Sequence, residues 1–220
     1  MKLISLNVGL PREVQRRGER IVTGIFKSPV TGPRRLSRLN VDGDAQADLT
    51  VHGGIHKAVY GYPAEHYNYW RAALPDTNLT WGMFGENFTM EGSLEDQVYI
   101  GERFQIGTAE VQITEPRLPC YKLGIRFGRA DMVKRFLASR RTGFYFAVVK
   151  PGVVESGSMF ERVHRPPHGV TIADLTRVLA FDQDDLDTLQ QIVQIEELSD
   201  AWRNHFRQKL YRHGRRSSTN

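Results

Sequence analysis

Cys120 is the only cysteine in the chain, and a cysteine side chain can bind a metal, act as a nucleophile or pack in the core. Pro116 and Pro119 stiffen the segment before it, and Arg117 and Lys122 flank it. Nearby cations favour the thiolate, which is the form of cysteine that binds metals and attacks electrophiles. A lone cysteine is more often a small buried hydrophobic residue. The residues therefore leave two interpretations open: a core residue, or a thiolate ligand of a metal that arrives within a cofactor.

Metal sites built only from protein ligands are not expected. With one cysteine, the chain has no intramolecular disulfide and no cysteine-rich zinc or iron–sulfur site. His52 and His56 have the spacing of a helical zinc motif, but Gly53 and Gly54 between them oppose a helix, and the general-base glutamate is missing. We expect a turn with two loop histidines, at least one of them close to a ligand.

Glycine-rich loops beside polar residues form the second candidate feature. Glycine permits positive φ and lets backbone N–H groups approach a ligand closely. Any one loop could be only a tight turn, but three loops with Lys57 just after one of them favour a ligand site. The motifs of phosphate-binding and dinucleotide-binding loops are missing. The loops are Asp42–Asp44, Gly53-Gly54 and Gly82–Asn87.

Composition sets the frame for these residues. The 220 residues are 40% hydrophobic and 25% charged, enough for one large domain or for a medium domain with a small appendage. Global disorder is excluded. Apolar runs stay below the ~18 residues that a membrane helix needs, and the amino terminus lacks the apolar segment of a secretory signal. We expect a cytoplasmic protein that does not bind membranes.

Positive charge is concentrated at the amino terminus. Residues 1–40 hold nine lysines and arginines against two glutamates, within a net charge of +5 for the whole chain. Such a segment suits an anionic partner, either nucleic acid or a phosphorylated cofactor, although ordinary surface charge also explains it. Because no zinc-finger spacing, RNP1-like string or GXXG loop occurs, specific nucleic-acid binding is not expected.

Short apolar alternations predict many strands before residue 165. Two helices interrupt them, one starting at Pro63 and running to residue 74, the other over 130–141. This pattern favours a β-barrel-like domain with insertions over a doubly wound sheet. The predicted strands are Lys2–Val8, Arg20–Phe26, Gln97–Ile100, Arg103–Ile106, Glu110–Thr114 and Phe144–Val149.

Helical periodicity replaces the strand pattern after residue 169. Three helices are predicted over residues 171–180, 184–195 and 198–212, too short to be stable alone. Thr171 is expected to cap the first with Asp174 in a capping box, Asp182 or Asp184 the second, and Ser199 the third. The segment lacks the glycine loops, the cysteine and the cationic strings, so we expect an appendage outside the pocket.

Together these strings resemble the MOSC family, named for the carboxy-terminal domain of molybdenum-cofactor sulfurase, and above all its small bacterial YiiM-like members. The order and spacing fit over residues 1–165, and the helical tail resembles their three-helix extension. The chain has His56 where relatives often carry Asp, and we expect this difference to modify the pocket without abolishing it. The matching strings are Phe26–Val30, Asp42–Asp48, Val51–Tyr60, Tyr62–Tyr67, Phe84–Thr89, Glu115–Lys122 and Thr142–Tyr145.

The resemblance implies a mainly β fold in two parts. Residues 1–165 would form a MOSC-type β-barrel with inserted helices, and residues 170–213 a small three-helix domain. The barrel would hold molybdenum cofactor (molybdopterin), not pyridoxal phosphate, with Cys120 as the molybdenum ligand and catalytic residue. The cofactor-binding residues would be Lys57, His56, Gly54, Gly85, Glu86, Asn87, Arg117 and Tyr121.

The resemblance also implies an activity, the reduction of small N-hydroxylated compounds to amines. Substrates would include 6-N-hydroxylaminopurine and related base analogues, and the role would be detoxification. Electrons would come from a separate flavoprotein reductase, since the chain has no flavin or nicotinamide fingerprint. The alternative is a molybdenum-cofactor carrier or sulfur-transfer protein without such turnover. The sequence leaves the oligomeric state open.

Overall fold

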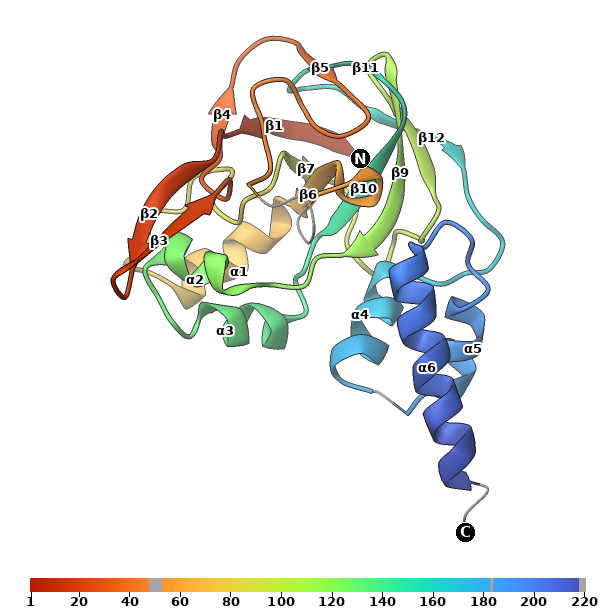
Figure 1. The fold of residues 1–220 in the computed structure, drawn as a ribbon. Helices are drawn as coiled ribbons and strands as arrows, with labels where there is room; N and C mark the ends of the chain where they lie inside the picture. Colours follow the sequence, from red (N-terminus) through yellow and green to blue (C-terminus); the bar gives the residue numbers. More distant parts are fainter. Residues whose placement is uncertain (48–52, 183, 218–220) are drawn as a thin grey trace.

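A mixed sheet of eight strands forms the centre of the computed structural model, which describes residues 1–47, 53–182 and 184–217 (Figure 1). The strand order is β12-β8-β9-β10-β6-β7-β1-β4, with β6 and β7 parallel and all other neighbours antiparallel. Two smaller sheets pair β2 with β3 and β5 with β11. The strands of the main sheet are β1 (Lys2–Val8), β4 (Ser28–Val30), β6 (Val59–Pro63), β7 (Phe88–Glu91), β8 (Arg103–Ile106), β9 (Ala109–Pro116), β10 (Phe144–Lys150) and β12 (Phe160–His164). The paired strands are β2 (Arg12–Arg16), β3 (Glu19–Thr23), β5 (Arg34–Leu36) and β11 (Gly152–Val154).

The predicted closed barrel is not confirmed. By strand pairing the main sheet of the described chain is open, with β12 at one edge and β4 at the other. The start of β1 reaches the segment before β12 through hydrogen bonds from Leu3 N to Ser158 O and from Phe160 N to Met1 O, both 2.9 Å. These few bonds join distant parts of a curved sheet without forming a ladder of paired strands.

Strand predictions were accurate where a tight turn or a simple alternation marks the element. β1 and β8 have the predicted bounds, and Gly107 turns the chain between β8 and β9 with a φ of 55°. The predicted strand Gln97–Ile100 was wrong, because this segment is a turn whose backbone bonds to the start of the helical region. There Ile100 N donates to Val170 O at 3.2 Å.

Three helices on one side of the sheet surround an aromatic cluster: α1 (Glu65–Ala73), α2 (Tyr121–Phe127) and α3 (Met132–Ser139). Pro63 does not start α1, because it pairs with Met90 as the last residue of β6. Helix α2 was not predicted. Large, nearly inaccessible side chains fill the cluster, so the strands and helices that meet there are held rigidly. They include Tyr62, Tyr67, Trp70, Phe84 and Phe136.

The three carboxy-terminal helices form as predicted and share the core of the sheet: α4 (Ile172–Ala180), α5 (Leu186–Ile192) and α6 (Asp200–Ser217). Thr171 and Asp174 form the predicted capping box. The second helix is capped by Asp185, whose side chain accepts from Thr188 N, and not by either predicted aspartate. Ile172 and the apolar face of α4 join the core of the sheet, so these helices pack on the sheet domain. As predicted, no described residue of these helices lines the cavity at Cys120. Among the described helices, none is both long and apolar enough to span a membrane.

Candidate functional site

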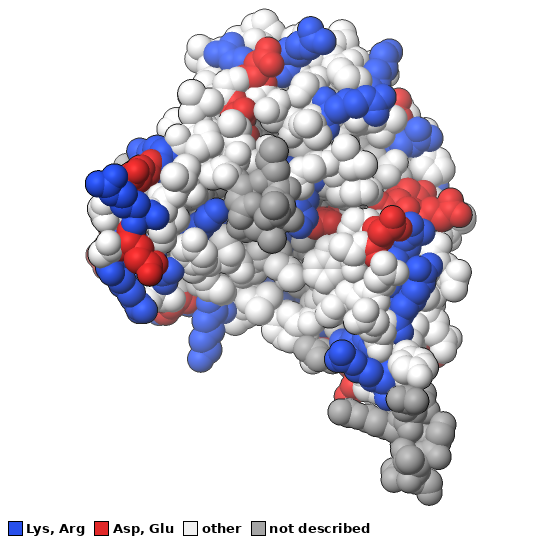
Figure 2. All heavy atoms as spheres, in the orientation of Figure 1, with Lys and Arg blue, Asp and Glu red and all other residues white. Residues whose placement is uncertain are grey.

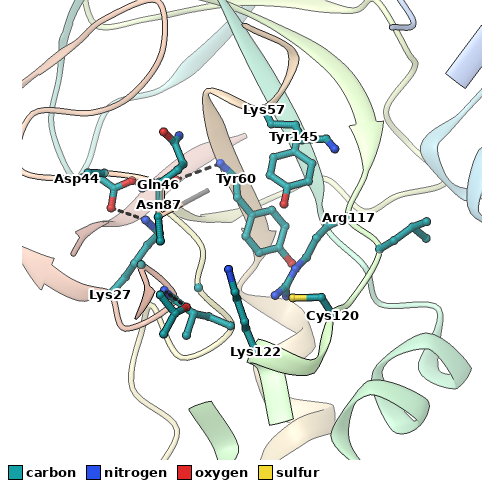
Figure 3. A pocket seen from close by; sticks show the side chains of 17 residues that line it. Lys27, Asp44, Gln46, Lys57, Tyr60, Asn87, Arg117, Cys120, Lys122 and Tyr145 are labelled. Carbon is teal, nitrogen blue, oxygen red and sulfur yellow. Dashed lines mark hydrogen bonds and ion pairs between the residues drawn. The ribbon is translucent and has the colours of Figure 1, made fainter. Parts of the chain in front are cut away.

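A cavity opens where the loop after β9 meets the end of β3 and the loop around Asp44 (Figure 3). Each wall comes from a different part of the chain. The Arg117–Lys122 loop supplies one wall, Thr23–Lys27 and Asp44–Ala47 a second, and β6 and β10 supply Tyr60 and Tyr145 as the floor. The rings of Tyr60 and Tyr145 lie 5.3 Å apart. The site therefore depends on the folded sheet and on no single sequence motif.

Cys120 is held in place by the elements on either side of it. Strand β9 ends at Pro116, and Cys120 sits in extended conformation directly before α2. Helix α2 buries Leu123 and Phe127 in the aromatic cluster, which anchors the backbone that follows the cysteine. The side chain of Cys120 is half-buried and lines the cavity. A polarisable sulfur thus faces a space that a ligand can enter.

Arg117 brings a buried positive charge to the same wall. It is only 6% exposed, and its guanidinium carbon lies 4.9 Å from the Tyr60 ring centre and 5.2 Å from that of Phe136. Its Nη1 atom is buried without a hydrogen-bond partner among the described residues. Figure 3 shows the guanidinium beside Cys120, and the two groups interact electrostatically. Buried polar atoms nearly always have a partner, so this nitrogen suits an anionic ligand.

A buried ion pair forms the opposite wall and was not singled out by the sequence analysis. Lys27 and Asp44 are 7% and 5% exposed, and the Lys27 ammonium binds Asp44 Oδ1. Burial lowers the pKa of Lys27, although Asp44 opposes the shift. Asn87 Nδ2 donates to Asp44 Oδ2 at 2.9 Å and Gly9 N to Oδ1 at 2.9 Å, so the carboxylate is fixed. Both residues stand in strings that resemble the family, and Asp44 also belongs to a predicted glycine-rich loop, but neither signal predicts that they pair.

Lys57 lines the cavity and pairs with Glu115 of strand β9. Its Nζ atom lies 3.2 Å from Glu115 Oε1 and 6.0 Å from the centre of the Tyr145 ring. Burial raises the pKa of Tyr145 to about 12, with Arg117 opposing the shift and Glu115 and Cys120 adding to it. The phenol therefore stays protonated at neutral pH and can donate a hydrogen bond into the cavity.

Of the predicted residues in the Gly82–Asn87 loop, Gly85 and Asn87 line the cavity and Glu86 does not. The Glu86 side chain is completely buried and accepts hydrogen bonds from four donors. Burial raises its pKa, and the donors oppose the shift. Its carboxylate therefore stabilises the conformation of the loop and does not line the cavity. The donors are Tyr67 Oη (2.5 Å), Gly82 N (2.8 Å), Thr89 Oγ1 (2.9 Å) and Phe84 N (3.0 Å).

Three further predicted residues lie outside the Cys120 cavity. His56 and Gly54 line a second cavity, at the 3-10 helix η1 (Ile55–Lys57), and Cys120 does not line it. Tyr121 is 43% exposed and packs under Arg16 of the β2–β3 hairpin, 4.7 Å from ring centre to guanidinium. His52 lies outside the described residues. The structure thus brings Cys120 together with four of the predicted cofactor-binding residues, and Lys122 lies beside them. The four are Lys57, Gly85, Asn87 and Arg117.

The basic amino-terminal segment does not form a uniform surface. On the face drawn in Figure 2, the arginines of the β2–β3 hairpin are interspersed with acidic side chains. Arg20 Nε lies 3.4 Å from Glu13 Oε1 across the hairpin. The lysines and Arg117 that line the Cys120 cavity are a separate set of positive charges, gathered around a concave site.

The residues of this cavity fit an anionic group that carries its own metal ligands. Lys27, Lys57, Arg117 and Lys122 line it, and two of these cations are balanced by Asp44 and Glu115. Among the described residues there is no cluster of three or more His, Cys, Asp or Glu side chains that could hold a metal ion. A metal bound through a single thiolate must therefore bring its remaining ligands, and soft sulfur suits a sulfur-ligated metal.

Comparison with known proteins identifies the family of the chain. The chain matches the MOSC domain over residues 48–161 and the YiiM-like 3-alpha helix domain over residues 170–213. The YflK protein of Bacillus subtilis (strain 168) is 40% identical over 207 residues, which cover 94% of this chain and 93% of that protein. A protein of Gibberella moniliformis (strain M3125 / FGSC 7600) named Reductase is 30% identical over 181 residues, which cover 81% of this chain and 32% of that protein. The crystal structure of YiiM from Geobacillus stearothermophilus superposes with a TM-score of 0.80 at 32% identity, covering 95% of this chain and 98% of that chain. The chain therefore belongs to the MOSC domain family, among its YiiM-like members.

Proposed function

We propose that this protein is a molybdenum-cofactor-dependent reductase that converts N-hydroxylated compounds to amines. One observation carries the proposal: Arg117, whose buried Nη1 atom has no hydrogen-bond partner within the described part of the chain, lines the Cys120 cavity together with three lysines. A cofactor with a phosphate and a metal bound by sulfur needs anion-binding groups and a soft protein ligand. A MOSC relative named Reductase supports the same reaction class.

Four side chains of the cavity have distinct roles in this proposal. Cys120 would hold the metal through its thiolate, and Arg117 and Lys122 would bind the anionic groups next to it. When bound, the cofactor supplies a metal centre that accepts the oxygen atom of the substrate. Tyr145 remains a phenol at neutral pH, so its Oη–H can orient an oxygen or nitrogen atom of the substrate by a hydrogen bond.

The overall reaction requires an external reductant. Reduction of R–NHOH to R–NH2 and water consumes two electrons and two protons, which breaks the N–O bond and releases the oxygen as water. We propose that a separate flavoprotein reductase supplies the electrons. Substrates of this class include 6-N-hydroxylaminopurine, and their removal would protect the cell from base analogues.

Protein purified from a molybdenum-replete host tests the proposal. Molybdenum is quantified by elemental analysis and pterin by fluorescence after oxidation, and conversion of 6-N-hydroxylaminopurine to adenine is followed with a chemical electron donor. We expect about one molybdenum and one pterin per chain, and turnover. Bound cofactor without turnover would reject the reductase and favour the carrier or sulfur-transfer alternative. Folded protein without molybdenum or pterin would reject both.

A further inference from the structure

A second cavity adjoins the Cys120 cavity at Lys57, which lines both. Its volume is about 530 Å³, within the range of small-molecule sites. One wall is the segment Gly53–Lys57, and the facing wall is the start of α6. The cavity therefore lies between the sheet domain and the carboxy-terminal helices, and the function proposed above gives it no ligand.

The wall supplied by α6 is aromatic. Trp202 and His205 line the cavity, with their rings 5.7 Å apart at nearly a right angle. Trp202 also stacks on the buried Phe206 at 5.7 Å and 22°, which fixes the orientation of the indole. Burial lowers the pKa of His205, and Lys209 and Arg212 add to the shift, which favours the neutral imidazole. This wall suits a planar, uncharged ring.

The end of the cavity toward the sheet is polar. Lys57 offers N–H donors, and Glu115, nearly inaccessible to solvent, offers carboxylate acceptors 3.2 Å away. Ser199 lies 3.5 Å from the other carboxylate oxygen of Glu115. One cation and one carboxylate balance each other, so this cavity favours a neutral ligand with both donor and acceptor atoms, unlike the cation-rich Cys120 cavity.

The polar end faces the proposed reaction site. Lys57 lines both cavities, and its Nζ atom lies 6.0 Å from the centre of the Tyr145 ring, which lines the Cys120 cavity. Tyr145 also interacts electrostatically with both Glu115 and Cys120, so these two residues lie near the same phenol. A ligand whose ring lies against Trp202 and whose edge meets Lys57 and Glu115 would therefore direct that edge toward Cys120. The exocyclic nitrogen of an aminated or hydroxylaminated heterocycle stands on such an edge.

From this arrangement we infer that the second cavity is the substrate subsite, which binds a planar heteroaromatic base by stacking on Trp202 and by hydrogen bonds to Lys57 and Glu115. The inference rests on the proposed function for the identity of the reacting group, but binding of the base itself does not require turnover. It gives the carboxy-terminal helices a direct part in substrate selection.

Calorimetric titration with adenine, the amine product of 6-N-hydroxylaminopurine, tests the subsite. It is carried out on the full chain as purified with its cofactor, on Trp202→Leu, and on the matched control Trp81→Leu. Trp81 is also half-buried but contacts Tyr67 and does not line the cavity. We expect adenine to bind the unmodified protein and Trp81→Leu alike, and Trp202→Leu roughly 5- to 150-fold more weakly, the range for loss of base stacking.

Each contrary outcome has a defined meaning. Adenine binding that is absent from the unmodified protein, or equal in Trp202→Leu with both variants folded by circular dichroism, would overturn the subsite. Adenine that binds only after the cofactor is removed would assign the cavity to the pterin and also overturn it. Failure of the proposed function is separate, because it would show as missing molybdenum or missing turnover while adenine still binds.

Discussion

Replacing Arg117 by methionine should lower cofactor occupancy far more than it lowers stability. Methionine keeps an unbranched apolar stem, so the packing against Tyr60 and Phe136 is largely preserved. A charge-assisted hydrogen bond contributes about 1.5–3 kcal/mol, so its loss weakens cofactor binding about 10- to 150-fold. In the cofactor-free protein one buried guanidinium nitrogen has no partner among residues 1–47, 53–182 and 184–217, so removing it relieves a desolvation cost.

The stability change should be small because two effects oppose each other. Removal of the buried charge relieves its desolvation cost, whereas the interactions of Arg117 with the Tyr60 and Tyr145 hydroxyls are lost. Loss of the cation–π contacts at 4.9 and 5.2 Å costs about 0.5–2 kcal/mol. We would measure pterin fluorescence after oxidation and the thermal midpoint of the same samples. Arg126→Met is the control, because Arg126 also has a buried Nε without a partner but does not line the cavity. Equal occupancy in both variants would refute the assignment of Arg117 to an anionic ligand.

Three further substitutions test how the site is built. Lys57→Met leaves the Glu115 carboxylate buried without its partner at 3.2 Å. The free energy of unfolding, measured in urea, should fall by up to about 3–5 kcal/mol. Adding Glu115→Gln should recover most of this loss, and a double variant as unstable as Lys57→Met alone would disprove the pairing. Gly85→Ala should cost about 1–2 kcal/mol, because φ is +82° and the new Cβ would meet Ile25 Cγ1 at 2.8 Å; an unchanged midpoint would contradict this conformation. Glu86→Ala leaves four donors without their acceptor and should lower the free energy of unfolding in urea by at least about 2 kcal/mol. An unchanged free energy of unfolding would show that the loop does not need this carboxylate.

Local sequence was sufficient for the part of the site that lies within one loop. Cys120 and Arg117 are three residues apart, and the prolines next to them restrict the backbone of the loop that holds both. The Lys27–Asp44 pair is different. Its members are 17 residues apart, and they meet only because the chain returns beside β1 through the bond from Gly9 N to Asp44. That return depends on tertiary packing, which no local pattern encodes.

The errors in element assignment have similar causes. Helix α2 has seven residues, too few for an apolar period to stand out, and it is stabilised by the burial of Leu123 and Phe127. Pro63 suits either the first turn of a helix or the end of a strand, and pairing with β7 decides for the strand. His56 and Lys57 are neighbours in the short helix η1, and both line the second cavity, but only Lys57 also lines the Cys120 cavity.

The most direct test of the central claim is turnover of 6-N-hydroxylaminopurine by Cys120→Ser, with a chemical electron donor and normalised to folded protein. Serine keeps nearly the same volume as cysteine, so the half-buried position before α2 should fold with a near-normal thermal midpoint. A hydroxyl stays protonated near neutral pH and is a harder, poorer ligand for molybdenum than a thiolate. Since the chain holds no second cysteine, we predict near-total loss of turnover in a folded variant. Substantial residual turnover would contradict the assignment and return Cys120 to a structural role.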